Sequence, residues 1–280
     1  MRTEHEVLNL ILNIARADER IRGVLLSGSR ANKMVPKDCY QDYDIAFAVT
    51  DMKPFYNNPD WIEAQFGKPC IMQMPETLRG AAHDGNFFYL MIFPDGVRID
   101  LSFIFDDAYI DDGEPVMVLL DKDDGNGFLP PIITICEKYW HIKPPTALDY
   151  RSNCNNFWWC LNNVAKGIMR DELPYVMHIL HDAVRVNLHE MITWYIGTQH
   201  GFNISAGKDG NFFKKLLIPE LYTQYAASFS DSNYNNIWQS VDVMCAMFPP
   251  LAIAVADYCG FSYHQDEEDG MRAYLSMIRK

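Results

Sequence analysis

Short apolar runs separated by polar turns dominate the first half of the chain, and they predict β-strands there. The runs cover residues 24–26, 45–49, 86–93, 97–103 and 116–120. The turn Pro94-Asp95-Gly96 joins the third run to the fourth and predicts a hairpin. Residues 3–16 instead have apolar side chains at helical spacing, and Thr3 and Glu6 form the capping box of a predicted helix.

The pattern changes around the paired prolines at 130–131 and 144–145, beyond which helical periodicity takes over. Helices are predicted over residues 152–170, 172–196, 211–227, 233–258 and 264–279. Pro249 and Pro250 should break the fourth helix, because proline removes a backbone N–H and clashes with the preceding turn. A chain of 280 residues exceeds the usual size of a single core. We therefore predict an α+β fold in two domains: a mixed β-sheet domain over residues 1–135 and an all-α helical bundle over residues 136–280.

The first two strands carry the candidate chemistry. Gly28 and Ser29 follow the first strand in a turn where glycine lets a ligand approach the backbone closely. Asp42 and Asp44 open the next strand, and their i, i+2 spacing points both carboxylates to one face. Such like charges need a cation, and their hard oxygen atoms suit Mg²⁺, which also binds substrate phosphates. The pair thus predicts a site for a metal-bound nucleotide, although a lone Asp-x-Asp is more often a solvated strand end.

A third acid stands at the centre of the strand over residues 97–103. Asp100 shares one face of this strand with Arg98 and Ser102, while apolar residues occupy the other face. A carboxylate in mid-strand needs a partner. If this strand lies beside the one that Asp42 and Asp44 open, Asp100 completes a set of three carboxylates. Arg98 or solvent is the alternative partner for Asp100.

The formal net charge of −13 argues against a nucleic-acid ligand, whose phosphates require basic patches. The charge is compatible with a cationic small substrate, although an acidic surface also serves solubility. No run of about 18 apolar residues is present, so we expect no membrane span, and the N-terminus lacks a signal-peptide core. Seven cysteines without a Cys-x-x-Cys pair predict free thiols in a reducing cytoplasm. Nothing requires an oligomer, so we expect a cytoplasmic monomer.

Polar residues in the helical half offer weaker candidates. His178, Asp182, Arg185 and His189 recur on one face of the predicted helix over residues 172–196. Such a stripe is usually a solvated face, but if it faces a cleft, Asp182 is the best candidate for contact with a substrate amine. Lys208 follows Gly207 in a loop that lacks the first glycine and the strand of a Walker motif. It is either a surface lysine or a contact for a triphosphate.

Gly28-Ser29, followed after twelve residues by Asp42-x-Asp44, resembles the signature of the polymerase-β-like nucleotidyltransferase superfamily. Further segments in both halves resemble the aminoglycoside 6-adenylyltransferases, the streptomycin-modifying family. These segments are residues 1–12 (MRTEHEVLNLIL), 28–32 (GSRAN), 41–45 (QDYDI), 99–101 (IDL), 192–197 (ITWYIG) and the pair 207–208 (GK). Their order and spacing carry the resemblance, and every motif acid is present.

The resemblance implies a polymerase-β-like nucleotidyltransferase domain followed by a helical substrate-binding domain, with the site between them. It implies transfer of AMP from Mg-ATP to a hydroxyl of streptomycin, expected to be the 6-OH, with release of pyrophosphate and resistance to the drug. The guanidinium groups of streptomycin would pair with carboxylates of the acidic chain.

The resemblance also implies roles for individual residues. Asp42, Asp44 and Asp100 would bind two Mg²⁺ ions. Asp100 would alternatively act as the general base that takes the hydroxyl proton. The nucleotide would be bound by Gly28, Ser29, Arg30 and Lys208. The acceptor would be bound by Asp182, Trp158 and Trp159.

Two other functions remain open from the sequence. One is a nucleotidyltransferase with another acceptor, such as a different aminoglycoside, a lincosamide or a protein hydroxyl. The other is a non-catalytic nucleotide-binding sensor on the same fold. The sensor hypothesis predicts the loss of a motif acid, whereas Asp42, Asp44 and Asp100 are all present.

Overall fold

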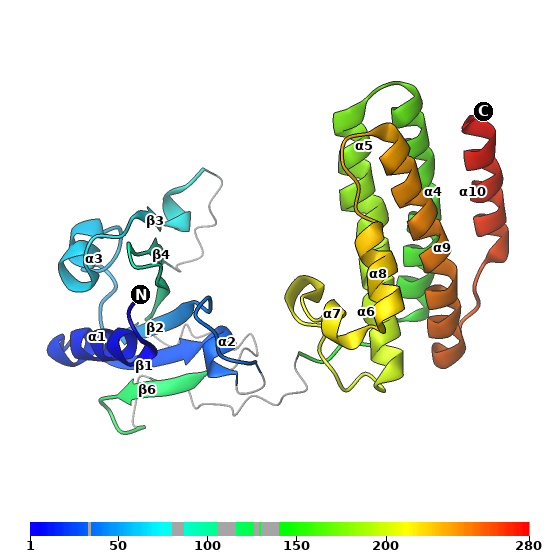
Figure 1. The fold of residues 1–280 in the computed structure, drawn as a ribbon. Coiled ribbons are helices and arrows are strands. Elements are labelled where there is room, and N and C mark those ends of the chain that lie inside the picture. Colours follow the sequence, from blue (N-terminus) through cyan, green and yellow to red (C-terminus); the bar gives the residue numbers. More distant parts are fainter. Residues whose placement is uncertain (33–34, 80–86, 106–115, 126–128, 130–139, 280) are drawn as a thin grey trace. The chain divides into compact units, whose positions relative to one another are not determined.

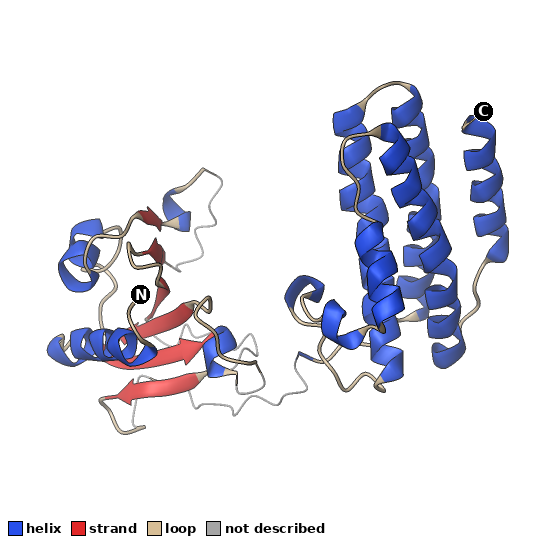
Figure 2. Ribbon diagram, in the orientation of Figure 1, coloured by secondary structure: helices blue, strands red, loops and turns tan. Residues whose placement is uncertain are grey.

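The computed structural model describes residues 1–32, 35–79, 87–105, 116–125, 129 and 140–279. The chain forms two compact units, Met1–Tyr139 and Trp140–Lys280, and each has its own hydrophobic core. Every described strand belongs to the first unit, and the described part of the second unit contains helices and turns (Figures 1 and 2). The α+β fold predicted from the sequence, with a sheet first and helices afterwards, is confirmed.

The sheet of the first unit holds six described strands in the order β3-β4-β5-β2-β1-β6. Strands β2 and β5 run parallel and the other neighbouring pairs are antiparallel, so the sheet is mixed. The predicted hairpin is formed by β4 and β5. The strands are β1 (Ile21–Ser27), β2 (Tyr43–Val49), β3 (Ile71–Gln73), β4 (Phe88–Ile92), β5 (Arg98–Ile104) and β6 (Met117–Asp121).

One face of this sheet shares a core with helices α1 (Glu4–Ala17) and α3 (Pro59–Phe66), as Figure 1 shows. Buried and half-exposed residues alternate along β5 and the first half of β2, as period-2 strands require. Side chains such as Phe47 and Leu101 are fully buried, and each contributes about 1.5–3 kcal/mol. The half-exposed face of the two strands therefore carries the polar residues.

Helix α1 begins as the sequence predicted. The Thr3 hydroxyl accepts from the Glu6 backbone N–H at 3.3 Å, and the Glu6 carboxylate accepts from the Thr3 N–H at 2.7 Å. This capping box satisfies two N–H groups at the start of the helix. A one-turn helix, α2 (Gly28–Ala31), follows directly after β1. The 3₁₀ turn η1 (Pro75–Thr77) lies shortly before residues 80–86, which are outside the described part of the chain. The prolines at 130–131 also lie outside the described residues.

The second unit is a bundle of long helices with shorter helices beside it (Figure 1). Its core includes the stacked rings of Phe157 and Phe248, whose centroids are 3.9 Å apart. The long helices are α4 (Ala147–Met169), α9 (Tyr234–Cys259), α10 (Gln265–Ile278) and the continuous helix formed by α5 (Leu173–Ile179), the π-helical segment η3 (Leu180–Arg185) and α6 (Val186–Gln199). The short ones are the 3₁₀ turn η4 (Lys208–Gly210), α7 (Phe213–Leu216) and α8 (Pro219–Ala227).

Helix α9 corrects one prediction, because it continues through Pro249 and Pro250 instead of breaking there. Pro249 has no N–H for the carbonyl of Cys245, four residues earlier. That carbonyl accepts a hydrogen bond from Arg272 Nη2 of α10 at 2.6 Å. A partner from another helix thus replaces the lost bond within α9. By length and composition α9 could cross a membrane, but 56% of its apolar 18-residue stretch is buried within the helical unit, as in a core helix.

The polar stripe predicted on the helix over residues 172–196 does not form one continuous solvated face either. The π-helical segment η3 changes the phase of the helix, because an i→i+5 turn contains an extra residue. His178 and Asp182 remain exposed and pair at 2.6 Å. Arg185 is buried and donates to the Ser228 hydroxyl at 2.7 Å.

Candidate active site

The parallel pairing of β2 and β5 places two of the predicted acids side by side. Asp44 of β2 lies opposite Asp100 of β5 in the register. Residues opposite one another in a sheet point to the same face, so both carboxylates belong to the half-exposed face. Asp42 directly precedes β2. The strand neighbourhood on which the prediction for Asp100 depended is therefore present.

Gly28 closes the site beside Asp44. Its φ of +69° lies in the left-handed region that glycine tolerates and other residues rarely adopt. A Cβ atom on Gly28 would come within 2.1 Å of the Asp44 Oδ2 atom. The turn therefore requires glycine twice, for its conformation and for its close approach to the carboxylate. Ser29 follows in the single turn of α2, where the first N–H groups have no partner within the helix.

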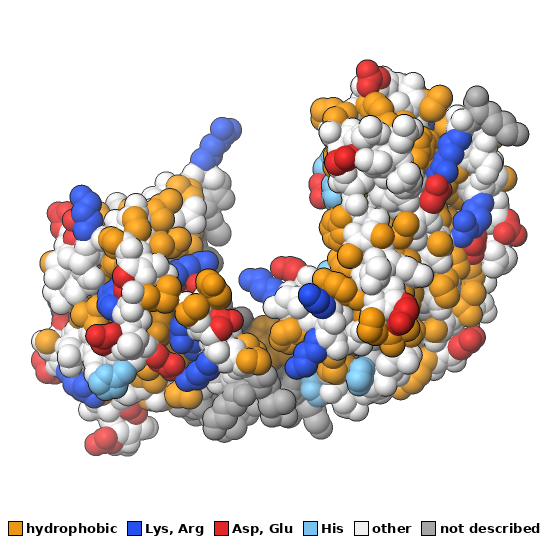
Figure 3. Space-filling view, viewed as in Figure 1, with side chains coloured by type: hydrophobic (Ala, Val, Ile, Leu, Met, Phe, Trp, Pro, Cys, Tyr) orange, Lys and Arg blue, Asp and Glu red, His pale blue; other side chains and the backbone are white. Residues whose placement is uncertain are grey.

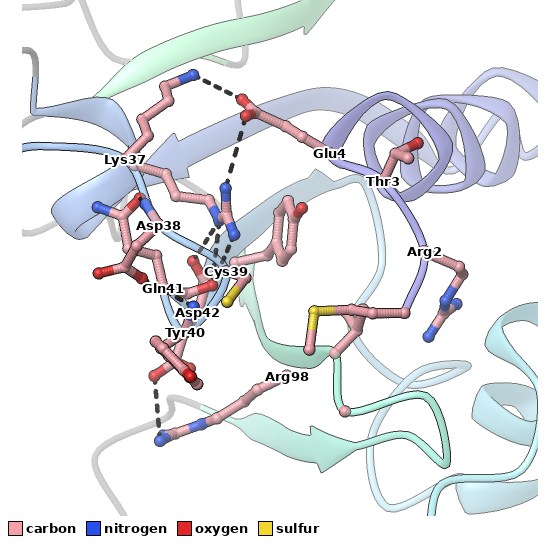
Figure 4. A pocket seen from close by; sticks show the side chains of 15 residues that line it. Arg2, Thr3, Glu4, Lys37, Asp38, Cys39, Tyr40, Gln41, Asp42 and Arg98 are labelled. Carbon is pink, nitrogen blue, oxygen red and sulfur yellow. Dashed lines mark hydrogen bonds and ion pairs between the residues drawn. The ribbon is translucent and has the colours of Figure 1, made fainter.

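Arg98 joins two of the three acids. Its Nε and Nη2 donate to the two carboxylate oxygens of Asp100 at 2.9 and 2.6 Å, and its Nη1 lies 3.1 Å from Asp42 Oδ2. Figure 4 shows the guanidinium reaching from its strand to Asp42. The two hypotheses for Asp100, a third acid beside Asp44 or a partner of Arg98, therefore both describe the structure.

The charges of the site affect one another. Burial raises the pKa of the Asp42 carboxyl, the Arg98 guanidinium lowers it, and the neighbouring Asp100 raises it. The hydrogen bonds to Asp100 raise the pKa of Arg98, so its positive charge is held firmly. The positive charge of the Arg98 guanidinium therefore partly compensates the negative charge of the acids at this edge of the sheet.

Arg30 is not an open phosphate ligand in the structure but a buried side chain with several contacts. Its Nε donates to the Asp42 carbonyl at 3.0 Å and its Nη2 to the Gln41 carbonyl at 2.8 Å. The guanidinium stacks over the Tyr43 ring at 3.9 Å and lies 3.6 Å from Glu4 Oε2. It therefore connects α2, the start of β2 and α1.

A cavity of about 250 Å³ opens beside these residues, as Figure 4 shows. It is lined by the start of the chain, by the segment over residues 37–43 and by the hairpin residues 96–98. Lys37 and Glu4, which pair at 2.7 Å, form part of its wall. Charged groups of both signs line this cavity.

The donor atoms of the site fit magnesium, because carboxylate oxygens from two adjacent strands are the hard ligands that Mg²⁺ prefers. Within the described residues, no three His, Cys, Asp or Glu side chains are already grouped closely enough to hold a metal ion. Two of the three relevant carboxylates are instead turned toward Arg98. The chemistry of the ligands fits, and their present orientation is that of ion pairs with arginine.

The remaining candidates belong to the helical unit. Lys208 is exposed in the turn η4, after Gly207 with its φ of +74°. Trp159 is 65% exposed, whereas Trp158 is 2% exposed and donates through Nε1 to the Tyr263 hydroxyl at 3.0 Å. Burial in the core leaves Trp158 no surface for an acceptor. Asp182 is exposed beside His178.

Sequence reasoning missed the contacts of two arginines. The alternation of Arg98 and Asp100 on one face of a strand indicated their own pairing, but nothing in the sequence indicated the pair with Asp42. The backbone carbonyls that Arg30 binds carry no sequence signal at all.

Comparisons with known proteins give the same family throughout. A family model described as streptomycin adenylyltransferase matches residues 1–278. An aminoglycoside 6-adenylyltransferase of Bacillus subtilis (strain 168) is 36% identical, covering 99% of this chain and 98% of its own. One of Campylobacter jejuni is 37% identical over 94% and 91% of the two chains. One of Staphylococcus aureus is 32% identical over 96% of both.

A crystal structure of an aminoglycoside 6-adenyltransferase from Bacillus subtilis is 32% identical, covers 100% of this chain and 99% of its own, and superposes with a TM-score of 0.48. The matches in sequence define the class of the protein, a nucleotidyltransferase enzyme. Within that class, the chain belongs to the streptomycin adenylyltransferase family.

Proposed function

We propose that the chain transfers AMP from Mg-ATP to a hydroxyl of streptomycin, the 6-OH, with release of pyrophosphate and resistance to the drug as the consequence. The observation that carries the proposal is the register of β2 and β5. It sets Asp44 against Asp100, with Asp42 directly before the same strand and Gly28 against Asp44. Membership of the family supports the acceptor and the nucleotide.

Each group of the site has a part in the proposed reaction. The acceptor oxygen attacks the α-phosphorus of ATP, the bond from that phosphorus to the bridging oxygen breaks, and pyrophosphate leaves. Asp100 accepts the hydroxyl proton as general base, or it serves as a metal ligand beside Asp44. The N–H groups of Gly28 and Ser29 bind the triphosphate at the start of α2. Lys208 is the proposed second contact of the triphosphate.

Asp42, Asp44 and Asp100 are the residues that would hold magnesium, as two ions. Bound there, Mg²⁺ supplies positive charge against the phosphoryl oxygens and the leaving pyrophosphate. The protein's part is to fix Asp44 and Asp100 on two adjacent strands, which a rigid sheet does better than loops, with Asp42 directly before the first of these strands. Arg30 supports this arrangement by donating hydrogen bonds to the backbone carbonyls of Gln41 and Asp42, directly before β2.

The charge of the chain supports a cationic acceptor. With a formal net charge of −13, the protein attracts guanidinium and ammonium groups and repels nucleic acid. On the face shown in Figure 3, the Lys and Arg side chains of the described residues are interspersed with Asp and Glu. We propose that Asp182 and Trp159 of the helical domain bind the acceptor, through a bidentate ion pair and a cation–π contact. Their exposure makes them available to a ligand.

The decisive experiment measures pyrophosphate release from Mg-ATP with and without streptomycin. We expect release that depends on streptomycin, and a loss of about a hundredfold or more in the variants Asp42→Asn and Asp44→Asn. Asp51→Asn is the matched control, because Asp51 is an exposed acid just beyond the other end of β2. Mass spectrometry of the product should show the addition of one AMP unit.

Other outcomes distinguish the alternatives. Release only with another aminoglycoside, a lincosamide or a protein substrate would change the acceptor and keep the chemistry. ATP binding without transfer to any member of the acceptor panel would favour the sensor hypothesis. An increase in KM for streptomycin in Asp182→Asn and Trp159→Ala, with little change in KM for ATP, would support their roles.

We also propose that the protein acts in the cytoplasm as a monomer. ATP and a reducing environment are found there, and the described cysteines form no disulfide. Light scattering of the purified protein tests the monomer, and activity in the cytosolic fraction tests the location.

A further inference from the structure

Arg98 occupies a central place among the acids of the proposed magnesium site. It binds both oxygens of Asp100 and lies 3.1 Å from Asp42 Oδ2, and the charge of Asp44 also acts on it. A structural salt bridge joins one acid to one base. Here a single guanidinium pairs with two of the three carboxylates proposed to bind the metal, and the charge of the third also acts on it.

We infer that Arg98 is a built-in counter-ion of Asp42, Asp44 and Asp100, which a divalent cation displaces when it binds. This inference rests on the proposed function, since it assigns Arg98 a role at the same metal site. It adds a residue that the reaction scheme above does not use.

The charges of the group explain why a counter-ion is needed. The carboxylates of Asp44 and Asp100 on adjacent strands and of Asp42 directly before β2 repel one another, and one guanidinium compensates only part of their charge. A divalent cation compensates more of it from a smaller volume, with oxygen ligands that match its preference. The guanidinium and the metal repel each other and require the same carboxylate oxygens. One therefore binds at the expense of the other.

The exposure of the groups permits this exchange. The Arg98 side chain is 42% exposed, so it can leave the acids without disturbing the core, while Asp100 is 17% exposed and stays in place. Once released, a guanidinium is a bidentate donor suited to phosphate oxygens. Arg98 then lies near the edge of the sheet where the triphosphate of the metal-bound nucleotide is proposed to bind.

The test measures Mn²⁺ binding by electron paramagnetic resonance of the free ion, without ATP or streptomycin. We expect Arg98→Gln to bind Mn²⁺ about three- to tenfold more tightly than the wild type, because the competing cation is gone. Arg98→Lys, which keeps the charge but not the bidentate geometry, should fall between the two. Adding Asp44→Asn to Arg98→Gln should abolish the gain.

Arg2→Gln is the matched control for net charge. Arg2 lines the same cavity, but it pairs with Asp95 at 2.9 Å instead of the three acids. An Mn²⁺ affinity of Arg98→Gln that equals that of Arg2→Gln would overturn the inference. Weaker binding would also overturn it, and would mean that Arg98 arranges the acids for the metal. Failure of both Arg98→Gln and the wild type to bind Mn²⁺ would overturn it as well.

Thermal unfolding gives a second measurement on the same variants. In EDTA, Arg98→Gln should unfold at a lower temperature than the wild type, because the acids repel one another without a counter-ion. Saturating Mg²⁺ should reduce this difference, since the metal stabilises only the folded state that binds it. An unchanged difference would count against displacement. None of these measurements needs AMP transfer. The inference can therefore fail while the proposed activity stands, and the proposed activity can fail while the displacement of Arg98 by a metal is observed.

Discussion

Gly28 lies so close to Asp44 that a methyl group on its Cα would meet the carboxylate, at 2.1 Å from Oδ2. The turn after β1 and the acid in β2 thus form one fitted unit. A side chain on Gly28 would therefore displace the Asp44 carboxylate.

The variant Gly28→Ala should lose about a hundredfold or more in activity, because a displacement of one ångström at a reacting centre has that effect. It should also lose about 1–2 kcal/mol of stability, since alanine is strained at a φ of +69°. Gly67→Ala is the control: φ is +85° there and no atom lies within 4 Å of the new Cβ. We expect Gly67→Ala to lose similar stability and to keep its activity, and equal activity in the two variants would contradict the fit.

Arg30 is expected to be a structural residue first. Arg30→Met should lower the free energy of unfolding by about 2–3 kcal/mol, because the carbonyls of Gln41 and Asp42 lose their donor. Lys37→Met removes the other cation that contacts Glu4, and because Lys37 is exposed it should cost less than about 0.5 kcal/mol. Urea denaturation measures both. A higher KM for ATP at unchanged stability would mean instead that Arg30 contacts the nucleotide directly.

Arg272 is expected to stabilise the proline-containing part of α9. Arg272→Met should cost about 2–3 kcal/mol, because the Cys245 carbonyl facing Pro249 is left without a donor and Glu268 loses its ion pair. The control is Arg279→Met, directly after the same helix, which removes an exposed pair with Asp242 and should cost less than about 1 kcal/mol. Equal midpoints in urea would show that the proline site needs no help from α10.

The pair of Arg2 and Asp95 should make stability depend on acid pH. The hydrogen bonds from the Arg2 side chain hold the pKa of Asp95 well below its usual range. A carboxyl whose pKa is lower in the folded state stabilises the protein above its unfolded pKa of about 3.9, and this contribution is lost as the pH falls toward the folded pKa. Thermal unfolding between about pH 6 and pH 2 should therefore show a smaller loss in Asp95→Asn than in the wild type. Arg2→Gln should reduce the loss in the same way, and parallel curves for all three proteins would refute the linkage.

Local features of the sequence sufficed for much of the fold. Period-2 alternation gave β5 and its two faces, Pro94-Asp95-Gly96 gave the hairpin, and Thr3 with Glu6 gave the start of α1. These features depend on interactions between residues only a few positions apart, so they can be recognised directly in the sequence. The candidate acids were likewise visible, Asp42 and Asp44 from their i, i+2 spacing and Asp100 because a carboxylate at the centre of a strand is unusual wherever it occurs.

Contacts between distant segments were decided only by the tertiary structure. The sequence could not tell that β5 lies parallel to β2, which sets Asp100 against Asp44, or that Arg98 binds Asp42 as well. It predicted a break at Pro249 that an arginine of another helix prevents. The physical reason is the same in each case. Ion pairs and hydrogen bonds form between groups a few ångströms apart in space, whatever their separation along the chain, so the sequence alone does not show which groups will meet.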